Sequence, residues 1–254
     1  MTLTHALLIL LAGMAAGTIN TIVGSGTLVT FPTLLAFGYP AVAANVSNSL
    51  GLVAGGISGT IGYRKELAGA GADIRRLAPM SFLGAITGAL LLIWLPASAF
   101  DAIVPVLILL GIVLVIAGPR LQQWAKAHHA DHESTGRRVA LGLGVFGAGV
   151  YGGYFGAAQG VLLIGLMSVL MAAPLQRING LKNVLSTIVN AVAALTFLVI
   201  ALDKVDWAVA GLIAAGSLIG GVIGARVGRR LHPNVLRAFI VIVGVVTVVW
   251  LLTK

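Results

Sequence analysis

The sequence contains no cysteine and very few charged residues. Only 9% of its 254 residues are charged, against roughly 25% in an ordinary soluble domain, and 59% are hydrophobic. The lack of cysteine excludes disulfide bonds, cysteine-ligated metals and a cysteine nucleophile. The shortage of charge excludes a soluble domain, which could not bury so much apolar surface, and a disordered chain, which would be rich in charge.

Carboxylates are also scarce: the chain has seven Asp and Glu residues against 16 Lys and Arg. We expect all seven in loops, so none is available at membrane depth, where proton- or cation-coupled carriers often place one. With His5 as the sole histidine in an expected span, the sequence offers no nucleophile–base pair at that depth. We therefore expect that the protein is not an enzyme. The seven are Glu66, Asp73, Asp101, Asp131, Glu133, Asp203 and Asp206.

What the sequence has instead is long apolar runs. Runs of about 20 residues are long enough to cross a bilayer as helices. They predict an all-α integral membrane protein, and glycine, at 34 residues, is frequent as it is in transmembrane helices. The expected spans are Leu3–Ile22, Ala41–Tyr63, Leu77–Leu95, Ala102–Gly118, Val139–Ala157, Leu181–Leu202, Trp207–Ala225 and Val235–Leu252.

Two further apolar pieces, Thr27–Phe37 and Val161–Ala173, are too short to span comfortably. Each follows a glycine-containing break, the first at 24–26 and the second at 156–160. We expect both to be half-helices or re-entrant segments, and whether they cross the bilayer is left open.

The net charge of +9 reflects basic residues in the connections between spans. Alternate crossing puts four of these connections, carrying most of the basic residues, on one side, which the positive-inside rule makes the cytoplasm. Both termini then face outward. No basic stripe with interleaved aromatic residues is present, so we expect no nucleic-acid partner.

An internal repeat is indicated by glycines. Gly13, Gly17 and Gly24 recur at an offset of 136 residues as Gly149, Gly153 and Gly160. Each set opens a long span, a break and a short piece, and a polar cluster follows. The halves start on opposite sides, so we expect two inverted repeats, 1–118 and 139–254, joined by a cytoplasmic linker at 119–138. Each repeat has about four full spans plus a short broken helix, for eight to ten transmembrane helices.

Inverted repeats with interrupted helices are typical of secondary transporters. Irregular backbone at membrane depth must face protein or a wet cavity, and a half-helix N-terminus suits an anion. Amides and hydroxyls at the breaks can donate to an oxyanion without neutralising it. The alternative is that these groups join helices, and that Lys182 is an interfacial lysine. The expected substrate-binding residues are Asn20, Thr21, Ser25, Asn45, Ser47, Asn48, Gln159, Asn179, Lys182 and Asn183, and Thr27, Ser49, Ser186, Thr187 and Asn190 are further polar residues of the same clusters.

A metal site is a weaker alternative. The linker carries a composition that resembles a metal cluster, but no matched set of ligands is present elsewhere. We therefore expect no metal and no cofactor. The residues concerned are His128, His129, Asp131, His132 and Glu133.

The first-half motif resembles the TauE/SafE family of sulfite and organosulfonate exporters. It comprises the run from Gly13 to Gly26, with Asn20 within it, then Phe31-Pro32, Gly38, Asn45 to Asn48, and Tyr63-Arg64. The second half, from Gly149 to Gly160 and from Arg177 to Asn183, is similar to the matching repeat. The resemblance implies an inner-membrane transporter of sulfite, sulfoacetate or related anions, with its site at the breaks. Two departures from the family's glycine runs are Thr27 after Gly26 and Ala157-Ala158-Gln159 after Gly156.

The expected function is therefore secondary transport of a small sulfur-containing anion, in the direction of export. Export of an anion from an inside-negative cell gains about 2.3 kcal/mol per charge per 100 mV, so it needs no embedded carboxylate. The alternatives are an importer of another small anion and a non-transporting scaffold subunit. The expected partners are the small anion and the lipid bilayer, and a homodimer is left open.

Overall fold

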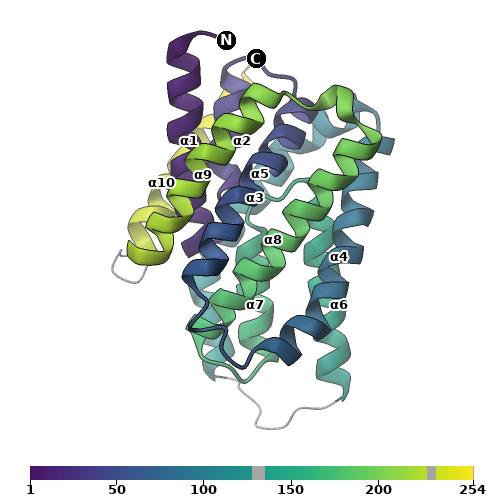
Figure 1. The fold of residues 1–254 in the computed structure, drawn as a ribbon, viewed down its shortest axis with the longest axis vertical. Helices are drawn as coiled ribbons and strands as arrows, with labels where there is room; N and C mark the ends of the chain where they lie inside the picture. The colour runs from purple at the N-terminus through teal and green to yellow at the C-terminus, as the bar shows by residue number, and fades with distance from the viewer. Residues whose placement is uncertain (128–134, 228–232, 254) are drawn as a thin grey trace.

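The computed structural model describes residues 1–127, 135–227 and 233–253, and these residues form helices joined by short connections (Figure 1). The predicted all-α fold is confirmed. The first half contains α1 (Leu3–Ile22), α2 (Thr27–Ala36), α3 (Ala41–Gly62), α4 (Gly71–Trp94) and α5 (Ala97–Ala127). The second contains α6 (Thr135–Tyr154), α7 (Gln159–Leu170), α8 (Leu175–Ile200), the short 3-10 helix η1 (Leu202–Lys204), α9 (Trp207–Val227) and α10 (Pro233–Leu252).

The helices are those of an integral membrane protein. Within the described residues, five are long and apolar enough to cross a membrane: α1, α4, α5 up to Arg120, α8 and α9. Side chains such as Leu195 and Val199 are 61% and 82% exposed, which is unfavourable in water and favourable against lipid. α3 and α6 have comparable lengths but carry more glycine and polar residues. Each predicted long span corresponds to a helix, and the two short pieces correspond to α2 and α7.

Several helix boundaries differ from the prediction. α8 begins at Leu175, directly after Pro174, rather than at Leu181, so Asn179 and Lys182 lie inside the helix. α5 continues to Ala127 and α6 begins at Thr135, so parts of the predicted linker are helical. An apolar run ends at the first charged residue, whereas a helix continues through Arg, Lys, Gln and Ala, which are good helix formers.

In each half, the short helix after the break turns back along the long helix before it. The ring of His5, at the start of α1, stacks on that of Phe37, just after α2, with centroids 4.3 Å apart. In the second half, Arg137 near the start of α6 donates a 2.8 Å hydrogen bond to the carbonyl of Val169 near the end of α7. The end of α2 therefore lies beside the start of α1, and the end of α7 beside the start of α6. That α2 and α7 are half-helices or re-entrant segments stays a prediction.

The molecule has two chemically different ends (Figure 1). Both termini lie at one of them, the N/C end, together with Pro40, Asp101 and Leu251, which line one cavity. The opposite end, here the arginine end, brings together the starts of α4 and α8, where Arg177 pairs with Asp73 at 2.9 Å. α1 therefore starts at the N/C end and α6 at the arginine end.

Helix pairings in one half have a counterpart in the other. α1 packs along α9, and α4 packs along α6; α3 also packs on α9, and α8 on α4. α2 contacts α10, and α7 contacts α5. Each pairing in one half is therefore matched by a pairing of the corresponding helices in the other half. The expected internal repeat would produce this pattern. The inversion of the two halves relative to a bilayer stays a prediction.

Glycine allows the closest of these pairings. A Cβ atom on Gly17 would overlap the backbone of Ser217 in α9, and one on Gly153 would overlap the backbone of Ala85 in α4. The repeated Gly13/Gly17 and Gly149/Gly153 spacings therefore serve helix packing within the chain, as small residues do in membrane proteins.

Candidate functional site

The first break follows α1, and its geometry depends on a glycine. The N–H groups of Val23 and Gly24 both donate to the carbonyl of Ile19, at 2.7 and 3.1 Å. Gly24 has φ +88°, a left-handed conformation that a residue with a Cβ adopts only at a cost. This turn ends α1 and leaves carbonyls of its last turn without partners inside the helix.

The second break repeats this turn after α6. Phe155 and Gly156 both donate to the carbonyl of Tyr151, at 2.9 and 3.1 Å, and Gly156 has φ +79°. The glycine that ends α6 is therefore Gly156, and α6 stops at Tyr154, three residues before the predicted end at Ala157. α7 begins at Gln159, so Gln159 and Gly160 belong to its first turn.

The two breaks meet. The N–H of Gly160 donates a 3.0 Å hydrogen bond to the carbonyl of Gly24. A Cβ atom on either glycine would overlap the backbone of the other. Two glycines that the sequence matched across the halves are thus in direct contact, and the neighbouring residues Ser25 and Gln159 flank that contact.

Lys182 of α8 lies beside this junction and is fully buried. Its Nζ donates hydrogen bonds of 2.8 and 2.9 Å to the main-chain carbonyls of Asn20 and Thr21. These carbonyls belong to the last turn of α1, where the helix dipole places partial negative charge. Its aliphatic chain lies over Gly160, since a Cβ there would meet its Cδ. The alternative of an interfacial lysine is therefore wrong.

Asn45 of α3 makes the corresponding contact with the other break. Its Nδ2 donates a 2.9 Å hydrogen bond to the carbonyl of Tyr154, the last residue of α6. The carbonyl end of each broken helix is thus bound by a polar side chain from the opposite half. Asn183 adds a longer bond, 3.4 Å from its Nδ2 to the carbonyl of Thr21.

Asn48 joins α3 to the first turn of α2. Its Nδ2 donates to the hydroxyl of Thr27 at 3.3 Å, and its Oδ1 accepts from the hydroxyl of Thr30 at 2.5 Å. The sequence did not single out Thr30. Thr30 lies three residues after Thr27, and this spacing puts both hydroxyls on one face of a helix. That spacing is the sequence signal that could have identified Thr30.

Several buried polar atoms around the breaks have no hydrogen-bond partner. They include the Ser25 hydroxyl, the Gln159 Nε2 and the Asn45 Oδ1. The Ser186 hydroxyl, one turn beyond Lys182 on the same face of α8, and the Tyr154 hydroxyl are also unpartnered. A buried polar atom without a partner is costly, so such a group in a native protein calls for water or a ligand.

Two expected site residues lie elsewhere. The hydroxyl of Ser47 accepts a 2.8 Å hydrogen bond from the N–H of Asp206 at the N/C end. The Nδ2 of Asn179 donates to the hydroxyl of Tyr63 at the arginine end, at 2.9 Å. Asn20 and Thr21 do reach the junction, through main-chain carbonyls. The structure thus brings eight of the ten expected residues to the breaks, Asn20, Thr21, Ser25, Asn45, Asn48, Gln159, Lys182 and Asn183.

An aromatic cluster packs against the second break. Phe155 contacts Phe31 of α2 edge-to-face with centroids 5.1 Å apart, and Phe100 of α5 lies 6.1 Å from it. All three rings are buried.

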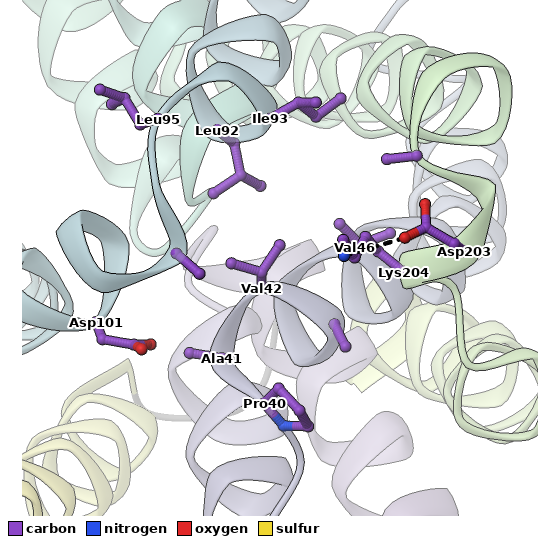
Figure 2. Close-up of a pocket in the computed structure, with 13 residues that line it drawn as sticks. Pro40, Ala41, Val42, Val46, Leu92, Ile93, Leu95, Asp101, Asp203 and Lys204 are labelled. Carbon is purple, nitrogen blue, oxygen red and sulfur yellow. Dashed lines mark ion pairs between the residues drawn. The ribbon is translucent and has the colours of Figure 1, made fainter.

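Another cavity at the N/C end, which Asp101 also lines, has a volume of about 470 Å³ (Figure 2). Figure 2 shows Val42 and Val46 of α3 between Asp101 on one side and the Asp203–Lys204 ion pair, 3.0 Å long, on the other. The hydrogen bond from Lys204 holds the pKa of Asp203 below its ordinary value. The cavity is thus rimmed by more carboxylates than cations.

The acidic residues in the described part of the chain lie near the ends of helices. Asp73 and Asp101 were expected in loops, but they lie in the first turn of α4 and the second turn of α5. Among the described residues, no group of three or more His, Cys, Asp and Glu side chains could hold a metal ion. The histidine-rich stretch of the linker, His128 to Glu133, lies outside the described residues.

Comparison with known proteins shows the family of this chain. Residues 9–251 match the family model described as "Sulfite exporter TauE/SafE". The chain is 28% identical over 233 residues to "Probable membrane transporter protein YfcA" of Escherichia coli K12, covering 92% of this chain and 84% of that protein. It is 26% identical over 230 residues to "Probable membrane transporter protein" of Haemophilus influenzae, covering 91% and 88%. It is also 25% identical over 252 residues to "Probable membrane transporter protein ORF9" of a Sinorhizobium species, covering 95% and 90%. No solved structure matches.

Proposed function

Because the chain belongs to the TauE/SafE sulfite exporter family, we propose that it exports a small sulfur-containing anion, such as sulfite or sulfoacetate, across the bacterial cytoplasmic membrane. The coarser conclusion, a multi-pass membrane transporter rather than an enzyme, follows from the family and from the names of its relatives. The substrate, the direction and the residues that bind the anion are the proposal.

The observation that carries the proposal is the buried ammonium of Lys182 at the junction of the two breaks. It is bound by carbonyl oxygens and has no carboxylate partner among the described residues, so its charge is only partly balanced. An anion is the ligand that such a cation favours. The unpartnered Ser25 hydroxyl and Gln159 amide, on either side of the junction, are donors that would complete its shell.

The proposed site spans both halves. Lys182 and Gln159 come from the second half, and Ser25 and Asn45 come from the first. An anion held between the halves contacts both re-entrant turns, so a relative movement of the halves would expose it first to one side and then to the other. The expected inverted repeat, with its domains 1–118 and 139–254, belongs to this proposal.

The proposed direction follows from the charges at the two ends. The arginine end would face the cytoplasm under the positive-inside rule and would attract anions there. The N/C end carries Asp101, Asp203 and Asp206, which repel an anion returning from outside. An inside-negative potential favours efflux by about 2.3 kcal/mol per charge per 100 mV.

The test is sulfite flux from proteoliposomes of the purified protein, with a potential of either sign imposed and with sulfoacetate and sulfate as competitors. We expect efflux that accelerates when the interior is negative and that sulfoacetate slows. A flux that runs equally well at either sign would contradict the potential-driven mechanism. Folded protein that moves none of these anions would remove the proposed substrate class.

Lys182→Met provides the site-specific arm of the same experiment. This variant keeps the length of the side chain and removes its charge, so we expect flux at low sulfite concentration to fall strongly. Arg76→Gln, which removes an exposed cation at the arginine end, is the matched control and should keep its flux. Equal loss in both variants would argue that general surface charge, and not the junction, determines transport.

A further inference from the structure

A further cavity lies at the arginine end, and helix ends other than those of the breaks line it. It has a volume of about 420 Å³ and opens between the C-terminal ends of α3 and α9. Nothing in the proposed transport site uses it. Its lining residues are Ser58, Ile61, Gly62, Arg64, Lys65, Val222, Ala225 and Arg226.

The charge of this cavity is of one sign. Of the described residues, Arg64, Lys65 and Arg226 line it, and no carboxylate does. The guanidinium of Arg64 donates to the carbonyl of Ile61 at 3.3 Å and, like Lys65 and Arg226, forms no ion pair in the described part of the chain. Arg177, at the same end of the molecule, differs because it pairs with Asp73 at 2.9 Å. The cavity is therefore an unbalanced cluster of positive charge, which favours an anion.

The cavity continues into an exposed apolar surface. Ile61 lines the cavity and is 55% exposed, and Ile57, one helical turn before it on the same face of α3, is 47% exposed. On α9, Val222 lines the cavity, and Leu218 one turn earlier is 47% exposed. A water-soluble anion would gain nothing from contact with these apolar side chains. A hydrocarbon chain attached to the anion would pack along them.

The cavity floor holds the two helices together. The hydroxyl of Ser58 donates to the carbonyls of Gly55 in its own helix and Leu218 in α9, at 3.1 and 3.0 Å. A ligand seated above Ser58 and bound by Arg64 and Arg226 would join the ends of the same two helices. The site is therefore preformed by packing and is not merely a scatter of surface cations.

We propose that this cavity binds a phosphate group at the membrane surface, and that the apolar surface beside it makes an anionic phospholipid the source. Basic pockets between transmembrane helices are suited to such headgroups. The acyl chains would lie along Ile57, Ile61 and Leu218, and the phosphate would lie among the three cations. This inference requires a membrane protein but does not depend on which anion is transported.

The test compares two double variants in detergent micelles by thermal melting. Lys65→Gln/Arg226→Gln removes two of the cations that line the cavity. Arg75→Gln/Arg76→Gln removes two exposed cations from the start of α4, at the same end of the molecule but outside the cavity. The probe is phosphatidylglycerol added to the micelles, with phosphatidylcholine as the neutral lipid.

We expect phosphatidylglycerol, but not phosphatidylcholine, to raise the melting temperature of the unaltered protein and of the Arg75/Arg76 variant. The Lys65/Arg226 variant should lose at least half of that shift. A full shift in the Lys65/Arg226 variant, or an equal loss in both variants, overturns the proposal, because binding would then be elsewhere or follow net charge alone.

A separate arm identifies the source of the phosphate. Inorganic phosphate at millimolar concentration, added with phosphatidylcholine alone, should give less than a quarter of the shift that phosphatidylglycerol gives. If inorganic phosphate gives the whole shift, and the Lys65/Arg226 variant loses it, the ligand is a free anion and the lipid assignment is wrong. Because this readout is melting and not transport, it is independent of the outcome of the flux experiment.

Discussion

The ammonium of Lys182 donates a 2.8 Å hydrogen bond to the main-chain carbonyl of Asn20, and these residues are separated by 162 positions in the sequence. This bond joins α8 of the second half to the broken end of α1 in the first. The reciprocal bond, from the amide of Asn45 to the carbonyl of Tyr154, joins α3 to the broken end of α6. Each half therefore stabilises the irregular backbone of the other, and the junction cannot form from one half alone.

The first prediction concerns the charge of Lys182. A hydrogen bond to a charged group contributes about 1.5–3 kcal/mol, so we expect Lys182→Met to weaken anion binding by about 10- to 100-fold. The measurement is the concentration of sulfite that half-saturates flux. Lys182→Arg keeps the charge and should retain part of the activity, although the larger guanidinium must fit against Gly160.

A merely structural lysine would give a different pattern. If Lys182 only caps α1, Lys182→Met should lower the melting temperature and leave the half-saturating sulfite concentration of the folded fraction unchanged. That result would contradict its assignment as the anion ligand.

The second prediction concerns the contact between the breaks. Gly24→Ala introduces a Cβ atom that overlaps Gly160 and places alanine at φ +88°. The left-handed conformation alone costs about 1–2 kcal/mol, so we expect a clear fall in melting temperature.

Gly211→Ala is the matched control, because a Cβ at Gly211 meets nothing within 4 Å. In a helix this substitution should be neutral or stabilising, by up to about 1 kcal/mol. Equal melting temperatures for the two variants would mean that the close approach of the breaks is absent in the membrane.

The third prediction concerns the cap on α6. Asn45→Ala leaves the buried carbonyl of Tyr154 without its donor, which costs about 1–3 kcal/mol. Ser49→Ala, one turn further along α3, removes a hydroxyl that donates only to the carbonyl of Asn45 in its own helix. We expect Asn45→Ala to lower both the melting temperature and the flux, and Ser49→Ala to change neither substantially. A Ser49 variant as impaired as the Asn45 variant would show that any polar loss in α3 is disruptive.

The fourth prediction uses the absence of cysteine from the sequence. Because no native thiol is present, only the introduced cysteines react with a thiol reagent. His5→Cys and Phe37→Cys in one chain should be joined by a short thiol cross-linker, because the two rings stack at 4.3 Å. His5→Cys with Val169→Cys is the negative control, since these positions lie at opposite ends of the molecule. Efficient linkage of the control pair, or none of the test pair, would contradict the turn that brings the end of α2 back to the start of α1.

The same His5→Cys variant tests the orientation. We expect a membrane-impermeant maleimide to label it in intact cells, because both termini are predicted to face outward. If labelling requires the cells to be opened, the orientation is the reverse of the predicted one, and the basic cavity lies at the outer surface.

Much of the helical framework could be predicted from the sequence, because apolar runs and glycine breaks are local signals. The predicted first span, Leu3–Ile22, coincides with α1, and the predicted short piece Thr27–Phe37 is within one residue of α2. The start of α8 was predicted six residues late, because Arg177, Asn179 and Lys182 interrupt the apolar run while continuing the helix. Ser47 and Asn179 were grouped with their sequence neighbours, but helical geometry turns them toward other partners, Asp206 and Tyr63.

The sequence by itself determined that the chain is a helical membrane protein with two similar broken segments, because hydrophobicity and glycine positions act through the local backbone. Only the tertiary structure decided that Gly24 meets Gly160 and that Lys182 is buried against the end of α1. Those contacts join residues from opposite halves, and they depend on how α3 and α8 pack between the breaks. The physical reason is that a helix end leaves its carbonyls unsatisfied, and the donor that binds them is chosen by proximity in space rather than in the sequence.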